Sequence, residues 1–519
     1  MHVYSYVPGG YAGDLVSVEV DIRRGIPVTE IVGLPDNAIR EARERVRVAL
    51  RVSGLRYPED RVLVNLAPAG VRKTGASFDL AIAVGILSAS GQIDGPLPDR
   101  VLVLGELQLD ATVRPVHDVL SAVASANEAG ISEGLVPADN LREACALGRG
   151  RMRGVLTLLG ALESLAEAHD GTNDSFGAAD PRHRTPQAAL SVSEEDLPDL
   201  SELRGQARLK RVLEVSAAGR HNLIAVGPPG SGKTMGIRAL PSILPDLQKG
   251  EALEVTRIYS RAGLLDPRAG LFLRPPFRAP HHTASLPGIV GGGGGIMPGE
   301  ASLAHRGVLF LDEAAEFRKN VLQGLREPTE ERRIFIARAG RTYWYPANFQ
   351  LVLAANPCPC GYFGHPTRLC TCSMPEIHRY WKRLGGPLVD RIELRVRVEP
   401  EALVDSEAEA PKGSNSAHQV RERVAEAVER QRHRFGRSGM SRNVEMRASE
   451  ISGYLQASED DLGVVREAAQ KLSLSTRAML SVLRVARTIA DLEASPRTSR
   501  AHLLEAVQHR RLGEGGSWF

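Results

Sequence analysis

The residues most clearly suited to chemistry are those at positions 227–234, which read Gly-Pro-Pro-Gly-Ser-Gly-Lys-Thr. The apolar run at 222–226 predicts a buried strand before them, and residues 235–240 predict a helix after them. Glycines at a strand-to-helix turn let backbone N–H groups surround phosphate oxygens, and the helix N-terminus adds partial positive charge. The segment therefore predicts a P-loop, with a turn that merely matches the pattern as the alternative.

The predicted P-loop assigns a role to each of its polar side chains. Lys233 is expected to reach the outer phosphates of ATP, and the Thr234 hydroxyl is expected to bind Mg²⁺. ATP and Mg²⁺ are accordingly the expected cofactors. The predicted nucleotide-binding residues of the loop are Gly227, Pro228, Pro229, Gly230, Ser231, Gly232, Lys233 and Thr234.

Two further apolar runs end in polar residues. Residues 307–311 lead to Asp312 and Glu313, and residues 350–355 lead to Asn356. Ligands bind at the carboxyl ends of parallel strands, so we expect these side chains beside the P-loop. Asp312 would then hold Mg²⁺, Glu313 would polarise the attacking water and Asn356 would orient it. A helix-capping acidic pair and a strand-ending asparagine are the alternatives.

Four of the five cysteines lie close together, at Cys358, Cys360, Cys370 and Cys372. Four thiolates from two short segments suit tetrahedral zinc, and His365 between them is a candidate substitute ligand. A complete thiolate shell leaves no open position, so the zinc would be structural. Reduced cysteines or a redox pair are the alternatives.

A predicted hairpin carries two arginines at its tip. Residues 332–337 and 342–345 have strand-like composition, and they flank Arg338, Ala339, Gly340 and Arg341. Arg338, Arg341 and the neighbouring aromatic residues suit phosphates and stacked bases of DNA, and a solvated hairpin is the alternative. An arginine-bearing helix is also predicted at 419–435. Its arginines could face nucleic acid, and a solvated, salt-bridged face is the alternative.

Composition sets broad limits on the protein. The chain of 519 residues has 65 Lys plus Arg against 62 Asp plus Glu, so a nucleic-acid surface must be a local patch. Its length predicts roughly three domains of 100–200 residues. Neither a long apolar span nor a leader at Met1 is evident, which predicts a cytoplasmic protein without a membrane partner.

The first part of the chain resembles a known protease domain. Alternating strand and helix patterns from residue 3 to about residue 165 predict a separate α+β domain. The segment around Lys73 and Ser77, followed by an apolar helix, resembles the proteolytic domain of the Lon family. Ser77 occupies the position of the nucleophilic serine in Lon-type peptidases, but Leu120 occupies the position of their lysine base. A serine needs a base, so we expect a Lon-like fold without peptidase activity.

The later motifs resemble the Mg-chelatase and MCM branch of AAA+ ATPases. Residues 278–299 resemble its helix-2 insert, and the hairpin resembles its pre-sensor-1 hairpin. Arg391 lies in a segment resembling the one that carries the arginine finger, which implies a ring with ATP at subunit interfaces. Arg477 falls at the sensor-2 position, from which it could reach the γ-phosphate.

Several of these assignments have alternatives. A helix-capping Asp-Arg pair is the alternative for Arg391, and Arg484 and Arg487 are weaker sensor-2 candidates than Arg477. Residues 204–206, on a helix before the P-loop strand, would border the adenine in such proteins.

Nearly the full length resembles the Mg-chelatase-like ComM/YifB family. The implied fold is α/β and multidomain, with a Lon-like α+β domain at 1–168, a linker at 169–195 and an AAA+ P-loop core at 196–400. A connector and helical lid follow at 401–519. The implied function is that of a hexameric, ATP-driven DNA helicase. It would promote branch migration when incoming single-stranded DNA recombines in natural transformation.

Two other classes of function stay open. One is a motor subunit that helps insert magnesium into a porphyrin, and the other is a MoxR-like ATPase that remodels proteins. The lack of a second metallating subunit in this chain and the extra Lon-like domain count against the first class. The arginine-bearing hairpin with its aromatic residues counts against the second, so the expected partner is single-stranded or branched DNA.

Overall fold

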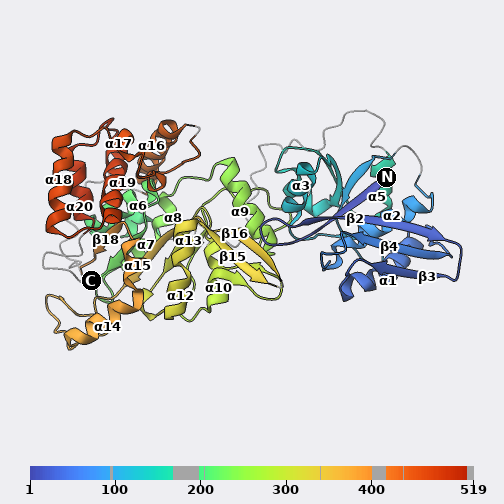
Figure 1. Cartoon of the computed structure of the whole chain (residues 1–519), viewed down its shortest axis with the longest axis horizontal. Coiled ribbons are helices and arrows are strands. Elements are labelled where there is room, and N and C mark those ends of the chain that lie inside the picture. The colour runs from blue at the N-terminus through green and yellow to red at the C-terminus, as the bar shows by residue number, and fades with distance from the viewer. Residues whose placement is uncertain are drawn as a thin grey trace.

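The computed structural model describes residues 1–93, 97–166, 198–203, 205–338, 340–399, 417–436 and 438–510. Figure 1 shows an elongated molecule, with the N-terminal domain at one end and the C-terminal helices at the other. A central α/β core lies between them, so the predicted α/β multidomain fold is confirmed. The predicted linker at 169–195 and connector at 401–416 lie outside the described residues.

The N-terminal domain is built on a seven-stranded sheet with the order β3-β4-β2-β1-β5-β8-β9. The pairs β1–β2 and β2–β4 are antiparallel and the other pairs are parallel, as expected for an α+β domain. Its strands are β1 (His2–Val7), β2 (Asp14–Arg23), β3 (Val28–Val32), β4 (Arg61–Ala67), β5 (Arg100–Val103), β8 (Glu133–Pro137) and β9 (Arg151–Val155). A small hairpin joins β6 (Glu106–Leu107) to β7 (Val113–Arg114).

Helices cover both faces of this sheet. The helices are α1 (Asn37–Val52), α2 (Asp79–Ala89), α3 (Val119–Glu128), α4 (Leu141–Cys145) and α5 (Leu158–Ala166). Helix α2 is apolar nearly all round and is buried, because α1 and the sheet enclose it. Helices α3 and α4 contribute to a separate apolar cluster on the other face of the sheet. The domain therefore has its own core.

The central core contains a five-stranded parallel sheet with the order β11-β14-β17-β10-β18. Its strands are β10 (Leu223–Val226), β11 (Phe277–Arg278), β14 (Val308–Leu311), β17 (Gln350–Ala355) and β18 (Leu394–Arg397). The three central strands are buried throughout, which explains their continuous apolar runs. Their carboxyl ends form one edge of the sheet, where the predicted catalytic residues follow.

Helices and two hairpins surround this sheet. The helices are α6 (Ala207–Gly219), α7 (Lys233–Arg238), α8 (Leu240–Ile243), α9 (Lys249–Arg261), α10 (Leu286–Val290), α11 (Glu300–Leu303), α12 (Lys319–Gly324), α13 (Arg326–Glu331), α14 (Met374–Leu384) and α15 (Gly386–Asp390). The predicted arginine-tipped hairpin is confirmed as β15 (Arg333–Arg338) and β16 (Arg341–Pro346). A second, short hairpin pairs β12 (Gly291–Gly292) with β13 (Met297–Pro298).

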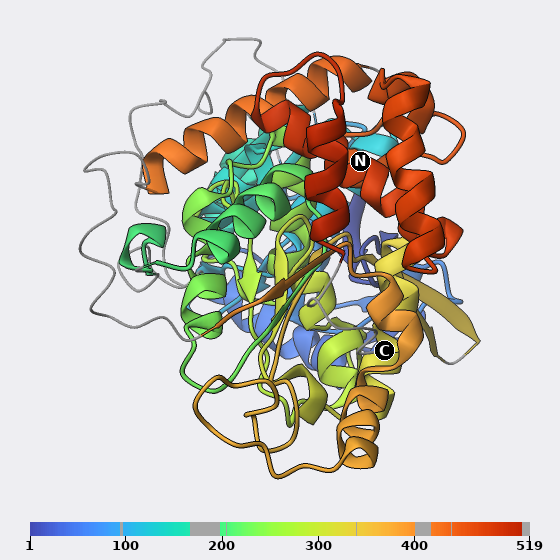
Figure 2. The ribbon, with the colours of Figure 1, turned by 90° about the vertical axis from the view of Figure 1, so that its left-hand side faces the viewer.

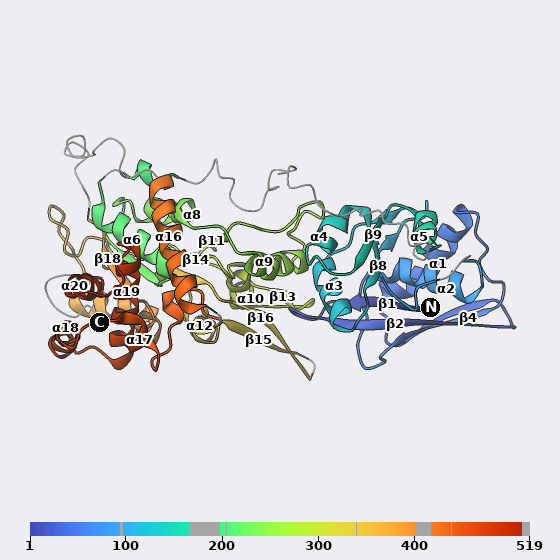
Figure 3. The same ribbon diagram turned by 90° about the horizontal axis from the view of Figure 1, so that it is seen from above.

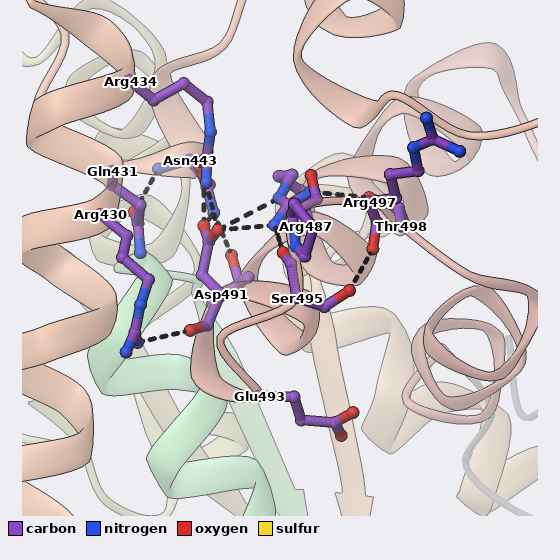
Figure 4. A network of polar contacts seen from close by, with 12 residues as sticks. Arg430, Gln431, Arg434, Asn443, Arg487, Asp491, Glu493, Ser495, Arg497 and Thr498 are labelled. Carbon is purple, nitrogen blue, oxygen red and sulfur yellow. Dashed lines mark hydrogen bonds and ion pairs between the residues drawn. The ribbon is translucent and has the colours of Figure 1, made fainter.

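The C-terminal helices pack on the core through α6. They are α16 (Ala417–Phe435), α17 (Ile451–Leu455), α18 (Glu459–Lys471), α19 (Thr476–Leu492) and α20 (Arg500–Gln508). Apolar side chains of α16 and α19 join the same cluster as those of α6 and β10. Asp491 of α19 bonds Arg434 of α16 at 3.0 Å and Arg487 at 2.8 Å (Figure 4). These bonds hold helices of the lid together. Apolar contacts fix the lid to the core, together with bonds such as that from the Gln431 amide to the Ala218 carbonyl of α6 at 3.1 Å.

The N-terminal domain contacts the core at α9 and at the arginine-tipped hairpin. Figure 3 shows both elements on the side of the core that faces this domain. The guanidinium of Arg257 on α9 lies 4.3 Å from the ring centroid of Tyr11. The Tyr11 ring in turn packs against Trp344 of β16, with centroids 5.1 Å apart. Asp118 donates its backbone N–H to the Ser260 hydroxyl at 2.8 Å. Both domains therefore contribute buried partners to this junction.

Among the helices in the part of the chain that the structure describes, none combines the length and apolar character needed to cross a membrane.

Candidate functional site: a nucleotide-binding edge and a cysteine cluster

The predicted P-loop joins β10 to α7, as expected from the sequence. Gly232 caps α7 with a φ of 88°, a left-handed conformation that favours glycine. Gly227 packs so closely on β18 that a Cβ there would lie 2.1 Å from the Val398 carbonyl oxygen. Close packing and left-handed backbone therefore both require glycine in this loop.

The Lys233 side chain folds back across the P-loop. Its ammonium donates to the carbonyl oxygens of Gly227 and Pro228, both at 2.7 Å, and lies 3.4 Å from Asn356 Oδ1. Burial lowers the pKa of Lys233 to about 8, although Asp312 and Glu313 oppose this shift. Phosphate oxygens at this place would favour the charged ammonium more than the two carbonyls do.

Thr234 and Asp312 are brought together at the same edge. The Thr234 hydroxyl donates to Asp312 Oδ2 at 3.0 Å. A hydroxyl and a carboxylate are hard oxygen ligands that suit Mg²⁺ when it also binds substrate phosphates. The two residues fit the predicted metal role.

Glu313 and Asn356 complete this edge of the sheet. Glu313 follows β14 in a left-handed conformation with φ 50°, and its side chain is 59% exposed. His282 Nδ1 lies 3.7 Å from the Glu313 carboxylate, and no local pattern in the sequence indicates this pairing. Lys233, Thr234, Asp312, Glu313 and Asn356 therefore follow three adjacent strands, as predicted.

Arg391 and Arg477 lie away from this edge. Asn222, just before β10, donates its side-chain amide to the Arg391 carbonyl at 3.0 Å, whereas the P-loop begins at the other end of β10. Both guanidinium groups bind the carboxylate of Glu330 on α13, each at 2.5 Å. The structure thus brings the two predicted catalytic arginines to each other but not to the P-loop of their own chain. Nothing in the sequence pointed to Glu330.

The two weaker sensor-2 candidates and the arginines of α16 have partners within the protein. Arg487 is 1% exposed and bonds Asp491, and Arg484 donates to the Met446 carbonyl. The arginines of α16 pair with carboxylates, which favours the salt-bridged face over a nucleic-acid surface for this helix. These paired residues are Arg421, Arg423, Arg430, Arg432 and Arg434.

The tip arginines of the hairpin contact two other segments. Arg338 donates to the carbonyl oxygens of Gly293 and Gly294 in the glycine-rich loop. Arg341 forms an ion pair of 3.2 Å with Asp14 of the N-terminal domain, and its side chain is 45% exposed. Figure 3 shows the hairpin projecting from the core beside this domain. The described residues of the tip are therefore at the surface, and the contacts of Arg338 and Arg341 are exposed.

The four clustered cysteines converge on one point. Their sulfur atoms all lie within 4.8 Å of one another, with Cys358 3.3 Å from Cys360 and 3.6 Å from Cys370. A tetrahedral zinc with Zn–S bonds of about 2.3 Å would place sulfurs roughly 3.8 Å apart. The cluster fits such an ion. His365 is not part of it, because its Nδ1 accepts the backbone N–H groups of Thr367 and Arg368.

The structure shows the surroundings of the residues on which the expected lack of peptidase activity depends. Ser77 lies in a 3-10 turn, and Leu120, at the position of the lysine base, is fully buried. Lys73, the domain's lysine, is also fully buried and donates to the Pro68 carbonyl. Burial lowers the pKa of Lys73.

The prediction that residues 204–206 lie on a helix was wrong for Gln206, and Arg204 lies outside the described residues. Gln206 precedes α6 in a left-handed conformation, and its amide donates to the Glu399 carbonyl at 2.7 Å. A contact between two residues that are 193 positions apart cannot be predicted from a local helical pattern.

Three family descriptions match successive parts of the chain. Residues 18–140 match "Subunit ChlI of Mg-chelatase", and residues 199–405 match "Magnesium chelatase, subunit ChlI". Residues 414–510 match "Magnesium chelatase, subunit ChlI C-terminal". In addition, Lon protease 2 of Bacillus subtilis is 27% identical over 150 residues, which is 26% of this chain and 27% of that protein. The Lon-like character of the N-terminal domain is consistent with this match.

Several curated proteins match almost end to end. An uncharacterised protein of Mycobacterium tuberculosis is 40% identical over 511 residues, covering 98% of both chains. Competence protein ComM of Haemophilus influenzae is 38% identical over 515 residues, covering 98% of this chain and 97% of that protein. Uncharacterised protein YifB of Escherichia coli is 38% identical over 515 residues, covering 96% and 94%. The chain belongs to the ComM/YifB family of magnesium chelatase-like proteins.

Proposed function

We propose that this protein is an ATP hydrolase whose active sites form between neighbouring copies in a ring. One observation carries the proposal: the P-loop and the Arg391–Arg477 pair lie at opposite ends of β10. The five steps along the chain from Asn222 to Gly227 span roughly 17 Å at about 3.3 Å per residue. Arg391 would therefore reach the nucleotide of an adjoining subunit.

Each residue at the nucleotide-binding edge has a task in this reaction. Lys233 exchanges its two carbonyl partners for phosphate oxygens, and Thr234 and Asp312 hold Mg²⁺. Bound Mg²⁺ supplies positive charge to the phosphates. Glu313 polarises the attacking water and Asn356 orients it, both from the ends of adjacent strands.

The arginines from the next subunit complete the site. Arg391 neutralises charge that develops in the transition state, and Arg477 contacts the γ-phosphate. To do so both must leave Glu330, whose side chain is 38% exposed. The Arg477 side chain is 43% exposed, so its ion pair contributes little free energy. The Arg391 side chain is 12% exposed, so the phosphate charge must replace the carboxylate that it leaves.

DNA is the substrate that we assign to the motor. The exposed hairpin tip with Arg338 and Arg341 suits phosphates, and Phe335 of β15, which is 53% exposed, suits base stacking. A relative that covers the whole chain is named competence protein ComM. We therefore propose a hexameric helicase that binds single-stranded or branched DNA and promotes branch migration in natural transformation.

The test is the ATPase rate with single-stranded, forked and duplex DNA. We expect stimulation by DNA, and a binding constant whose logarithm falls by about 0.7 per released phosphate with the logarithm of salt. Replacing both tip arginines, Arg338→Ala with Arg341→Ala, should reduce strand displacement and the salt dependence together. Arg466→Ala, an exposed arginine on α18, is the matched control.

Indifference of the ATPase to DNA would contradict the proposal. The matched family descriptions favour a magnesium chelatase-type motor subunit as the second candidate. Stimulation by a porphyrin-metallating partner, without any effect of DNA, would establish that alternative. Stimulation by a protein client would indicate a MoxR-like remodelling ATPase instead.

We also assign a structural zinc ion to Cys358, Cys360, Cys370 and Cys372. The distances among their sulfur atoms support this assignment. Metal analysis of the purified protein should find about one zinc per chain, as one complete thiolate shell holds one ion. Protein without zinc, with all four thiols reacting freely under native conditions, would refute it.

A further inference from the structure

The loop that carries the four cysteines lies directly against the P-loop. A Cβ added to Gly361 would lie 2.6 Å from Cδ of Pro229, so the Gly361 backbone packs closely against the ring of Pro229. Gly361 also has a φ of 86°, which favours glycine. Both loops line one cleft together with the end of β18, and its walls include Gly227, Pro228, Phe363, His365, Arg397 and Glu399.

Few polar contacts hold this part of the loop. Residues 358–372, all of which the structure describes, form no helix or strand, and Figure 2 shows them as a gold coil at the bottom of the molecule before α14. The Arg397 guanidinium donates to the Gly364 carbonyl at 2.7 Å, and the Trp381 indole donates to the Pro357 carbonyl at 3.1 Å. The Phe363 N–H donates to the Cys358 sulfur at 3.3 Å.

The cysteines occupy both ends of the segment that contacts the P-loop. Cys358 and Cys360 precede Gly361, and Cys370 and Cys372 follow the cleft-lining residues. A metal bound by all four closes this segment into a ring, which removes much of the conformational freedom that an open loop would have. The position of Gly361 against Pro229 then depends on the metal.

We propose that zinc bound by the four cysteines fixes residues 361–366 against the P-loop and so sets the affinity of the same subunit for nucleotide. The inference rests on the proposed ATPase function. It assigns the zinc a second task, which is to position the phosphate-binding loop. A zinc ion that only stabilised its own loop would leave nucleotide affinity unchanged.

The experiment measures zinc content and nucleotide affinity separately. Zinc is determined by metal analysis, and the dissociation constant is determined with a fluorescent ATP analogue. The key variant is Gly361→Ala, which keeps all four cysteines but disturbs the contact with Pro229. We expect it to retain zinc and to bind the analogue about tenfold more weakly, a change of roughly 1.4 kcal/mol.

Two further variants sharpen the result. Arg397→Ala removes the bond to the Gly364 carbonyl and should also weaken binding with zinc retained. Cys370→Ser combined with Cys372→Ser should lose zinc and weaken binding further. Gly439→Ala is the matched control, because Gly439 has a φ of 81° but no heavy atom within 4 Å of the added Cβ. It should bind the analogue as the unmodified protein does.

The outcomes separate this inference from the proposed function. Normal nucleotide binding by zinc-loaded Gly361→Ala would overturn the coupling alone. Normal binding by a zinc-free double variant that circular dichroism shows to be folded would do the same. Failure of the unmodified protein to bind nucleotide would overturn the ATPase assignment as well. Lys233→Ala should lose nucleotide yet keep zinc, which would show that zinc does not depend on the nucleotide.

Discussion

Two carboxylates in this molecule each hold a pair of arginines, but in very different surroundings. Asp491 bonds Arg434 and Arg487, and its side chain is 1% exposed (Figure 4). Glu330 bonds Arg391 and Arg477, and its side chain is 38% exposed. The first pair connects helices of the lid, whereas the second connects the lid to α13 and to the segment before β18.

This difference distinguishes a structural contact from an exchangeable one. Asp491 also accepts from the Asn443 amide at 2.8 Å, so removing it would leave several buried donors without a partner. Water can replace the carboxylate of Glu330 on Arg477, whose side chain is 43% exposed, at little cost. The Arg391 side chain is 12% exposed, so it needs another anion, such as a phosphate, in place of Glu330. The Glu330 contacts are therefore more easily exchanged than the fully buried contact of Arg487 with Asp491.

The largest expected effect comes from Arg391→Ala. Loss of a guanidinium that neutralises the transition state should lower the ATPase rate by roughly 10³- to 10⁵-fold, the range known for arginine fingers. Nucleotide binding should persist, because Lys233 and the P-loop are intact. Steady-state turnover and a binding titration measure the two quantities.

Arg383→Ala is a suitable control for this change. Arg383 is an exposed arginine of α14 that pairs with Glu316, and its removal should leave turnover nearly unchanged. Near-normal turnover of Arg391→Ala itself would contradict the role assigned to the residue.

An intermediate effect is expected from Asp491→Asn. The neutral amide keeps the shape but leaves the buried Arg487 without its carboxylate, which should cost about 3–5 kcal/mol of local stability. Hydrogen exchange of amides in α16 and α19 measures this loss. Arg430→Ala, which removes a half-buried arginine that donates to the Asp491 carbonyl at 2.9 Å, should change exchange by no more than about 1.5 kcal/mol. Equal protection in Asp491→Asn and the unmodified protein would refute the structural role.

The smallest effect is expected from Glu330→Gln. Loss of an exposed carboxylate should cost at most about 1 kcal/mol, and it should not lower the ATPase rate, because the arginines need to leave it. The arginine bonds lower the pKa of Glu330, so this small contribution is present above the pKa of the unfolded chain. It is lost as the pH falls through the folded pKa. A stability loss as large as that of Asp491→Asn would remove the contrast between the two sites.

The nucleotide-binding edge could be predicted from the sequence because local pattern determines it. The apolar runs of β10, β14 and β17 are buried throughout, and the polar residues follow them directly. Parallel strand ends share one edge, so Lys233, Asp312 and Asn356 could be placed together without knowledge of long-range contacts.

The arginine pairs could not be predicted in this way. Glu330 and Arg477 are separated by 147 positions, and Arg434 and Asp491 by 57. Arg477, Arg484 and Arg487 look alike in one helix, and only their burial and partners distinguish them. The junction of Tyr11 with Trp344 likewise depends on how two separately folded domains meet.

The most direct test of the account is whether two inactive variants restore each other. Lys233→Ala lacks a nucleotide site but supplies Arg391, and Arg391→Ala keeps the site but lacks the guanidinium. If active sites form between subunits, co-expressed variants should regain ATPase activity at interfaces that combine an intact P-loop with an intact arginine. A mixed assembly that stays as inactive as each variant alone would contradict the account.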